Sequence, residues 1–109
     1  MAKEGFVYLI CDNSNDCFKI GMTKQSLEKR IKELQTGNST ELFVSAYHKT
    51  KYPYTVEKML HNKFSSKHKL NEWFDLKLND ITKFNEYCDE IESLILTMID
   101  NPFFKKKLK

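Results

Sequence analysis

Hydrophobic and polar positions alternate in two short segments near the start of the chain. Residues 5–11 and 17–23 are rich in valine, isoleucine, phenylalanine and tyrosine, and the polar residues 12–16 between them favour a turn. The pattern predicts two antiparallel strands, each with one apolar face directed into the core. The positions on those faces are Val7, Leu9, Cys11, Phe18, Ile20 and Met22.

The opposite face of the two predicted strands carries Phe6, Tyr8 and Ile10 from the first strand and Cys17, Lys19 and Gly21 from the second. The same alternation places Tyr8, Lys19 and Gly21 there, and Tyr8 is expected nearly opposite Lys19, at cross-strand contact distance. Cys11 and Cys17 then point to different faces. Because the chain has three cysteines and no C-x-x-C spacing, we expect reduced thiols, and neither a disulfide framework nor a zinc site.

A helical spacing of apolar residues begins in the next segment. Residues 26–35 predict a helix with an apolar stripe, capped by Thr23 or Ser26 and ended near Gly37. The stripe consists of Leu27, Ile31 and Leu34. Arg30 is the one charged residue at the edge of this stripe, so its long side chain either extends to solvent or is recruited to a site.

Two more elements follow in the middle of the chain. Residues 41–49 predict a third strand, and residues 54–65 predict a second helix. Glu57 and His61 lie four positions apart on one rim of the apolar arc of this helix, so they project from it together. Residues 65–70, rich in lysine and serine, are expected to form a loop after the helix.

The last third of the chain combines an aromatic segment with a long helix. Residues 71–75 form a compact aromatic segment that should close the domain. Residues 80–100 show the strongest helical pattern in the sequence, with apolar residues every three or four positions and an acidic opposite face. Asn101-Pro102 should end this helix.

These elements suggest how the chain is divided. A length of 109 residues suits one compact domain with one core. We expect this domain over residues 1–78, an amphipathic helix over residues 79–101 and a basic tail over residues 102–109. The helix either packs back on the domain or forms the seam of a homodimer, since its apolar stripe permits both.

Positive charge is concentrated in the first part of the chain. Residues 1–70 hold 12 Lys/Arg against 7 Asp/Glu, a net charge of +5, and residues 71–104 hold 2 against 8, a net charge of −6. Either the basic part binds a polyanion such as nucleic acid, or it is a solvated surface with a chance excess of lysine.

The sequence also bears on the compartment of the protein. Its longest apolar run falls far short of the roughly 20 residues of a membrane span, and its first residues contain no apolar signal region. We therefore expect a protein of the cytoplasm or of the inside of a host cell, the nucleus included, that is neither secreted nor in contact with a membrane.

The order and spacing of these residues resemble the GIY-YIG nuclease superfamily over about residues 5–76. Phe6-Val7-Tyr8 is followed by Lys19-Ile20-Gly21, with an eleven-residue step from the tyrosine to the lysine, and an arginine follows in the next helix. Val56-Glu57-x-x-Leu60-His61 and Glu72-Trp73-Phe74 are similar to the branch common in phages and large DNA viruses.

Two positions depart from the motif. Phe6 stands in place of the first motif glycine, although Gly5 precedes it, and Lys19 stands in place of the second motif's tyrosine, where some members are similar in using lysine. The resemblance implies an α+β fold with a small antiparallel three-stranded sheet flanked by helices. It also implies hydrolysis of DNA, bound through its phosphate backbone, with one divalent metal ion, Mg²⁺ or Mn²⁺.

The resemblance implies a role for particular residues by position. Tyr8 matches the proposed general base for the attacking water, Arg30 the arginine that stabilises charge on the phosphate, and Glu57 the metal-binding glutamate. The pKa of a free tyrosine is about 10, so Tyr8 needs nearby positive charge to act as a base near neutral pH. We expect the Lys19 ammonium to supply this charge and to lower the pKa of Tyr8. His61 is expected to assist as a proton donor or by holding a water.

Further residues are expected to bind the substrate. They are Gly21, where the backbone can approach closely, Lys24 and His48. Each candidate also has a structural alternative, as a sheet aromatic, an exposed lysine, an extended arginine, a helix carboxylate or a packed histidine. Two alternative functions remain as well: a nucleic-acid-binding or interaction module that does not cleave, and a partner-binding domain that uses the acidic helix at residues 80–100.

Overall fold

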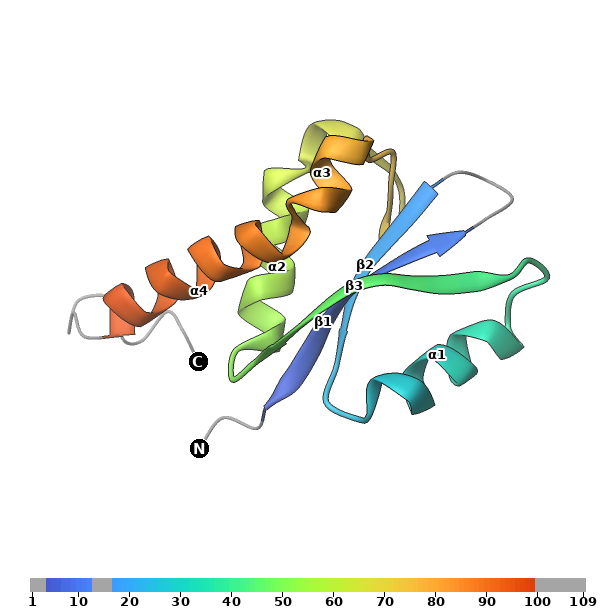
Figure 1. Ribbon diagram of the computed structural model, residues 1–109, viewed down its shortest axis with the longest axis horizontal. Coiled ribbons are helices and arrows are strands. Elements are labelled where there is room, and N and C mark those ends of the chain that lie inside the picture. The colour runs from blue at the N-terminus through green and yellow to red at the C-terminus, as the bar shows by residue number, and fades with distance from the viewer. Residues whose placement is uncertain (1–3, 13–16, 100–109) are drawn as a thin grey trace.

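A five-stranded antiparallel sheet with the order β3-β1-β2-β5-β4 forms the centre of the computed structural model (Figure 1). The strands are β1 Gly5–Asp12, β2 Cys17–Thr23, β3 Leu42–Thr50, β4 His68–Leu70 and β5 Trp73–Phe74. The α+β fold is thus confirmed, and the sheet has two short strands beyond the three that the sequence predicts.

The structure describes residues 4–12 and 17–99. Three of the sequence predictions fall outside these residues: the turn at 13–16, the helix end at Asn101-Pro102 and the basic tail at 102–109.

A tight hairpin of β4 and β5 replaces the predicted loop and aromatic segment. Asn71 in its turn has a φ of 54°, a left-handed conformation that asparagine tolerates. Strands of three and two residues are too short for alternation to reveal them in a sequence. β5 pairs with β2 through Phe74 with Phe18 and Trp73 with Lys19, so the hairpin turn comes beside the outer edge of β2.

The helices are α1 Leu27–Thr36, α2 Pro53–Lys63, α3 Leu78–Thr82 and α4 Phe84–Ile99, with a short 3₁₀ turn at Ser65–Lys67. Ser26 caps α1, because its hydroxyl accepts a hydrogen bond from the Lys29 N–H at 3.1 Å. Gly37 follows the end of α1 as predicted. α2 begins at Pro53, whose fixed φ suits the first position of a helix.

The prediction of one helix over residues 80–100 is wrong, because the segment forms two helices. Asp80 fixes the first turn of α3, since its carboxylate accepts the Lys77 N–H at 2.9 Å. The chain leaves α3 at Lys83, and α4 then begins at the fully buried Phe84. The apolar spacing continues across the break, so periodicity alone does not reveal it.

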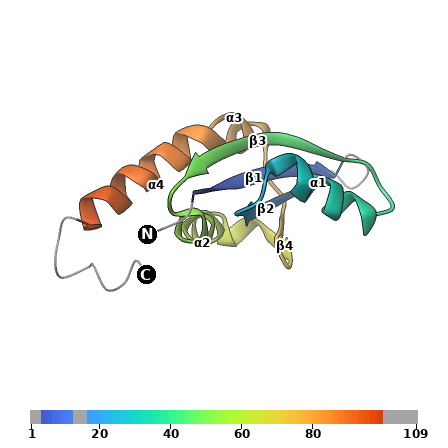
Figure 2. The ribbon, with the colours of Figure 1, turned by 90° about the horizontal axis from the view of Figure 1, so that it is seen from below.

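Helices cover both faces of the sheet (Figures 1 and 2). α2 and α4 cover one face, where the apolar sides of β1 and β2 form the main core as predicted. This core takes Val7, Leu9, Phe18 and Ile20 from the strands, Val56 and Leu60 from α2, and Phe84, Cys88 and Ile95 from α4. α1 covers the other face, over a smaller core of Tyr8, Ile10 and Leu42.

The faces of β1 and β2 are as predicted, but their register differs from the prediction. Tyr8 pairs directly with Gly21, and Ile10 pairs with Lys19. Lys19 therefore lies on the same face as Tyr8 as its diagonal neighbour, and the prediction that it lies opposite Tyr8 is wrong. A diagonal neighbour remains within reach of a long side chain.

α4 packs along α2 and β3 through its buried residues Phe84, Cys88 and Ile95. Burial, together with the nearby charges of Asp89 and Glu92, raises the pKa of the Cys88 thiol to about 12. Among the described helices, none combines the length and apolar character needed to cross a membrane. A homodimer through this helix stays a prediction.

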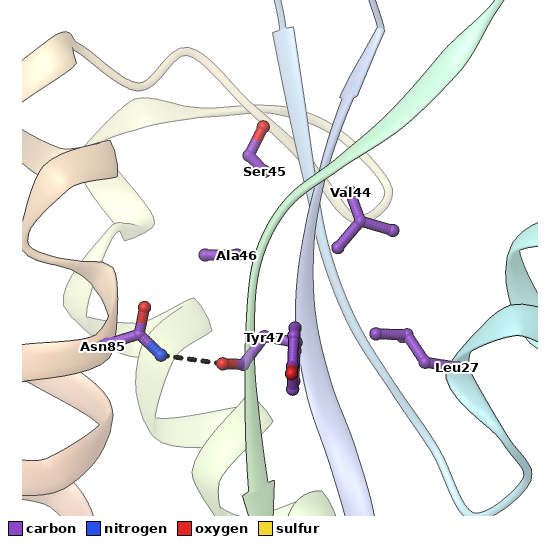
Figure 3. Close-up of a pocket in the computed structure, with 6 residues that line it drawn as sticks. All are labelled: Leu27, Val44, Ser45, Ala46, Tyr47 and Asn85. Carbon is purple, nitrogen blue, oxygen red and sulfur yellow. Dashed lines mark hydrogen bonds between the residues drawn. The ribbon is translucent and has the colours of Figure 1, made fainter.

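The edge strand β3 borders a shallow hollow of about 670 Å³ (Figure 3). Its lining residues are Leu27, Val44, Ser45, Ala46, Tyr47 and Asn85. The Asn85 side-chain amide donates to the Tyr47 carbonyl oxygen at 2.7 Å and joins α4 to the strand. β3 and β4 are the two edge strands of the sheet, so this hollow and the β4–β5 hairpin lie at opposite edges.

A polar contact also joins β3 to α4. His48 Nε2 lies 2.9 Å from a carboxylate oxygen of Glu92, and Asp89 lies 3.8 Å from the other ring nitrogen. Burial acts to raise the pKa of Glu92, but hydrogen bonds from Thr50 and His48 outweigh it and hold that pKa below its usual value. The ionised form of Glu92 therefore stabilises the packing of α4 on the sheet.

We expect Glu92→Gln to flatten the acid limb of the stability curve. A depressed pKa in the folded state means that Glu92 stabilises the protein above its unfolded-state pKa, and that this stabilisation is lost as the pH falls through the folded-state pKa. Urea unfolding between about pH 3 and 7 measures the difference. Glu90→Gln, at an exposed carboxylate of the same helix, is the control, and identical pH slopes for Glu92→Gln and wild type would contradict the prediction.

Candidate functional site

Tyr8 and Arg30 meet on the face of the sheet that α1 covers. Tyr8 is only 1% exposed, and its hydroxyl oxygen accepts a hydrogen bond from Arg30 Nε at 3.3 Å. Arg30 itself is partly exposed, with one of its terminal nitrogens 3.4 Å from Glu33. The sequence leaves two alternatives for the Arg30 side chain, extension to solvent or recruitment to a site. In the structure it contacts Tyr8.

Gly21 provides the space that the Tyr8 ring fills. A Cβ on Gly21 would lie 2.5 Å from the Tyr8 hydroxyl oxygen and 2.7 Å from the ring carbon that bears it. Glycine at this position is therefore explained by the packing of Tyr8 against β2. The expected contact of Gly21 with substrate stays a prediction.

The pKa of Tyr8 is raised, contrary to the expectation that Lys19 lowers it. Burial is the largest cause, the hydrogen bond and charge of Arg30 act against it, and the negative charges of Glu72 and Glu57 add to it. Tyr8 is therefore a protonated phenol at neutral pH, held by Arg30.

Lys19 is paired with a carboxylate that comes from the β4–β5 hairpin. Its Nζ lies 2.7 Å from an oxygen of Glu72, and its side chain is only 12% exposed. The same ammonium lies 5.7 Å from the centre of the Trp73 ring. Lys19 is thus enclosed by the hairpin turn, and the exposed-lysine alternative does not describe it.

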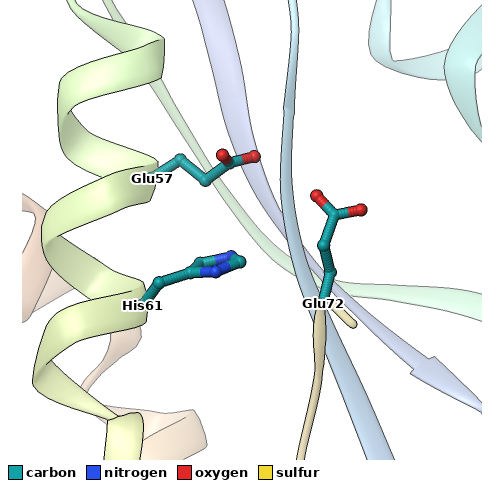
Figure 4. Close-up of side chains that lie close together, drawn as sticks. All are labelled: Glu57, His61 and Glu72. Atoms are coloured by element: carbon teal, nitrogen blue, oxygen red, sulfur yellow. The ribbon is translucent and has the colours of Figure 1, made fainter. Parts of the chain in front are cut away.

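Three potential metal ligands gather beside β2: Glu57 and His61 from α2, and Glu72 from the hairpin (Figure 4). Each contributes one possible ligand atom, and these atoms all lie within 4.8 Å of one another. All three residues are partly buried, so the cluster is reachable from solvent. Two carboxylates and an imidazole are ligands that Mn²⁺ accepts, and carboxylates with waters suit Mg²⁺.

The cluster forms because the outer edge of β2 extends beyond the end of β5. The Ile20 N–H still donates to the Glu72 carbonyl oxygen at 3.1 Å. Beyond that point, side chains of α2 replace a neighbouring strand. His61 Nε2 bonds the Ile20 carbonyl oxygen at 2.8 Å, and the Met22 N–H donates to the Glu57 carboxylate.

This backbone contact also settles the proton on His61. A carbonyl oxygen only accepts hydrogen bonds, so Nε2 carries a proton, and a lone pair for a metal ion can come only from Nδ1. Metal-binding histidines commonly donate their other ring N–H to a carbonyl in this way. The arrangement of His61 therefore fits a ligand. The ring also packs edge-to-face on Phe74, with the ring centroids 4.9 Å apart, as the packed-histidine alternative expects.

The carboxyl group of Glu57 is affected by burial and by the charges around it. Burial and the nearby Glu72 raise the pKa of Glu57, while His61, Lys19 and the Met22 N–H lower it. The net pKa is raised. A bound cation would relieve the repulsion between the two carboxylates, which is a property expected of a metal site.

The structure places the four main residues that the sequence singles out in two groups. Tyr8 and Arg30 form one pair, and Lys19 and Glu57 both adjoin Glu72. Tyr8 experiences the charges of Glu57 and Glu72, so the two groups share one electrostatic environment. The residues come from β1, β2, α1 and α2, with the hairpin turn joining them.

Two predicted substrate residues lie differently from expectation. His48 points to the main-core face, is 12% exposed and bonds Glu92 of α4, so its placement at the site is wrong. Lys24 is exposed just after the end of β2, at a position open to a ligand. Its phosphate contact stays a prediction.

Sequence reasoning missed Glu72 as a member of the site. It stands in the Glu72-Trp73-Phe74 segment, which the sequence marks as aromatic, as closing the domain and as similar to the phage and large-DNA-virus branch, with no role for the glutamate. The signal available was an acidic residue directly before a buried aromatic pair, but its partner Lys19 lies 53 positions away. Only the pairing of β5 with β2 brings the two together.

Comparison with known proteins gives a family match. The model of the T5orf172 domain, a phage-associated domain related to nuclease-type domains of the GIY-YIG and HNH kinds, matches residues 5–95. The matched range runs from the first residue of β1 into α4 and contains every residue of the cluster. No curated protein and no solved structure matches the chain.

We expect Gly21→Ala to destabilise the protein through a clash with Tyr8. Its backbone conformation accepts any residue, so the added methyl acts through the Tyr8 ring alone, at a cost of about 1–3 kcal/mol in the free energy of unfolding. Gly37→Ala is the matched control, because no atom lies within 4 Å of its Cβ position and little change is expected.

Urea unfolding of the single and double variants tests the origin of this cost. If Tyr8 causes it, Gly21→Ala costs less than about 1 kcal/mol in a Tyr8→Leu background, because the shorter side chain leaves room for the methyl group. An equal cost of Gly21→Ala in both backgrounds would show that the Tyr8 ring is not the obstacle.

Proposed function

The chain belongs to the T5orf172 domain family, and from this membership and the geometry of the site we propose that it is a metal-dependent endonuclease that hydrolyses phosphodiester bonds of DNA. One observation carries the proposal. A tyrosine held by an arginine lies in the same electrostatic environment as a cluster of Glu57, His61 and Glu72. Phosphodiester hydrolysis needs a base for water, positive charge at the phosphate and a site for a divalent ion.

Arg30 and Lys19 supply the positive charge. Arg30 uses Nε to hold Tyr8, and its terminal N–H groups remain at the partly exposed end of the side chain, where they suit phosphate oxygens. Lys19 adds an ammonium on the same face of the sheet. These donors stabilise the negative charge that grows on the phosphate as water attacks.

Tyr8 is the proposed base. It receives the proton of the attacking water while the water oxygen bonds to phosphorus and the bond to the leaving oxygen breaks. For this role Tyr8 must first lose its own proton, and Arg30 then stabilises the phenolate by hydrogen bond and charge. The negative carboxylates work against that ionisation until they are neutralised.

Glu57, with His61 and Glu72 beside it, would hold one Mg²⁺ or Mn²⁺ ion. When bound, the ion supplies concentrated positive charge next to the phosphate. His61 is oriented by the Ile20 carbonyl, and Glu57 by the Met22 N–H, so both ligands are fixed before binding.

The proposed substrate contact is with the phosphate backbone. Residues 1–70, which hold most of the site, carry 12 Lys/Arg against 7 Asp/Glu, and such charge binds DNA without reading its sequence. We therefore propose low intrinsic sequence specificity and binding that weakens steeply with salt.

A second candidate is a nucleic-acid-binding module on the same scaffold with little or no cleavage. The burial of Tyr8 and its raised pKa favour this candidate, as does Lys19 in place of the motif tyrosine. It predicts the same salt-sensitive DNA binding and no dependence of any cleavage on Glu57.

Plasmid nicking with Mg²⁺ or Mn²⁺ tests the proposal. We expect the wild-type chain to nick supercoiled DNA, and Glu57→Gln and Tyr8→Phe to lose about 10²–10⁴-fold in rate, since they remove a ligand and the base. Glu90→Gln, at an exposed carboxylate of α4, is the control and should retain full activity.

Two outcomes would contradict the endonuclease. Equal nicking by wild type, Glu57→Gln and Tyr8→Phe would mean that the activity comes from another site or from a contaminant. No nicking by the wild type, together with DNA binding that falls with salt, would favour the binding module instead.

A further inference from the structure

Lys19 occupies an unusual position for a charged strand residue. Its side chain is 12% exposed, and its ammonium lies 2.7 Å from Glu72, one of the three potential metal ligands. The cluster therefore contains its own cation in the protein as it stands. That cation and a divalent ion would need the same carboxylate.

The charges around the two carboxylates explain why a cation is needed there. Glu57 and Glu72 offer ligand atoms within 4.8 Å of each other, so their like charges lie close together. Two carboxylates so close repel each other, and Lys19 offsets one of them. If one partner of a partly buried ion pair is removed, the other charge is left unpaired, which destabilises the protein.

The Lys19 ammonium also has a possible alternative partner. It shares a face of the sheet with Tyr8 as a diagonal neighbour, and Arg30 donates to Tyr8 on that face. A lysine ammonium on a flexible four-carbon stem reaches alternative partners by rotation about its own bonds. A phosphate oxygen near Arg30 and Tyr8 is such a partner.

We propose that Lys19 is a built-in counter-ion for Glu72, which it releases when a divalent cation binds to the cluster and then donates to the substrate phosphate. This inference deepens the proposed function and rests on it. Metal binding and phosphate binding are coupled through one side chain, because Lys19 is available to the phosphate only when Glu72 is otherwise neutralised. Lysine in place of the motif tyrosine then has a functional reason, because a tyrosine would not supply the counter-ion.

The coupling makes a prediction that a purely structural role of Lys19 does not make. If Lys19 competes with the metal ion for Glu72, Lys19→Met should bind Mn²⁺ about five- to tenfold more tightly than the wild type. Lys19→Arg, which keeps the charge, should bind close to the wild-type value. Glu72→Gln should bind at least about tenfold more weakly, since a ligand is lost. Lys83→Met, at an exposed lysine between α3 and α4, should match the wild type.

Mn²⁺ titration followed by the electron paramagnetic resonance of free Mn²⁺ measures these affinities without any reaction. Unchanged or weaker Mn²⁺ binding in Lys19→Met would overturn the proposal. If Lys19→Met folds poorly, thermal unfolding with and without Mn²⁺ gives the same answer, because the tighter site should gain more stability from the ion than the wild type does. An equal or smaller gain would overturn it.

Trp73 provides a second readout of the movement itself. It is the only tryptophan in the chain, and the Lys19 ammonium lies 5.7 Å from its ring centre. Saturating Mg²⁺ should change the tryptophan emission of the wild type and leave that of Lys19→Met unchanged. An identical Mg²⁺ response in both would show that Lys19 stays in place.

These measurements separate the counter-ion from the nuclease. If the wild type and Glu57→Gln both fail to bind Mn²⁺, the metal site itself is absent and both proposals fail. If Mn²⁺ binds through Glu57 but Lys19→Met binds no more tightly, only the counter-ion fails. Tighter Mn²⁺ binding in Lys19→Met, together with no DNA cleavage by the wild type, would support the counter-ion and contradict the endonuclease.

Discussion

The candidate site depends on how the unpaired outer edge of β2 is satisfied. β5 covers this edge only as far as Ile20, and polar backbone groups beyond that point need partners. α2 supplies them, with His61 at the Ile20 carbonyl and Glu57 at the Met22 N–H. An imidazole and a carboxylate are thereby fixed side by side at the end of a sheet. The same contacts that complete the fold thus orient the groups that would bind a metal ion.

Charge balance links this edge to the other face of the sheet. Glu72 stands at the turn of the hairpin, where it adjoins Glu57 on one side and bonds Lys19 on the other. Burial is the largest cause of the raised pKa of both Glu57 and Tyr8. The charge of Glu72 adds to it at both residues, and Arg30 acts against it at Tyr8. A cation at the cluster would relieve both, which is why metal binding, Lys19 and the ionisation of Tyr8 belong to one system. In this account the fold keeps Tyr8 protonated until a cation binds to the cluster.

Much of this arrangement follows from the sequence because it is local. Alternation placed Tyr8, Lys19 and Gly21 on one face, and helical spacing placed Arg30 at the rim of α1 and Glu57 beside His61. The sequence could not reveal the β4–β5 hairpin, whose strands are too short for a pattern, and so the pairing of Glu72 with Lys19 was not foreseen. The apolar spacing continues across the break at Lys83 and does not reveal it, and the contact of His48 depends on where α4 packs, which is a tertiary effect.

The most direct test of this account is electron–nuclear double resonance on the Mn²⁺-loaded protein, which detects nitrogen atoms bound to the ion. The chain has three histidines, so His61→Gln identifies the source of any nitrogen signal. The account predicts coupling to one histidine nitrogen in the wild type and its loss in His61→Gln, with the fold intact by circular dichroism. Wild-type protein that binds Mn²⁺ without nitrogen coupling, or a coupling that persists in His61→Gln, would contradict it.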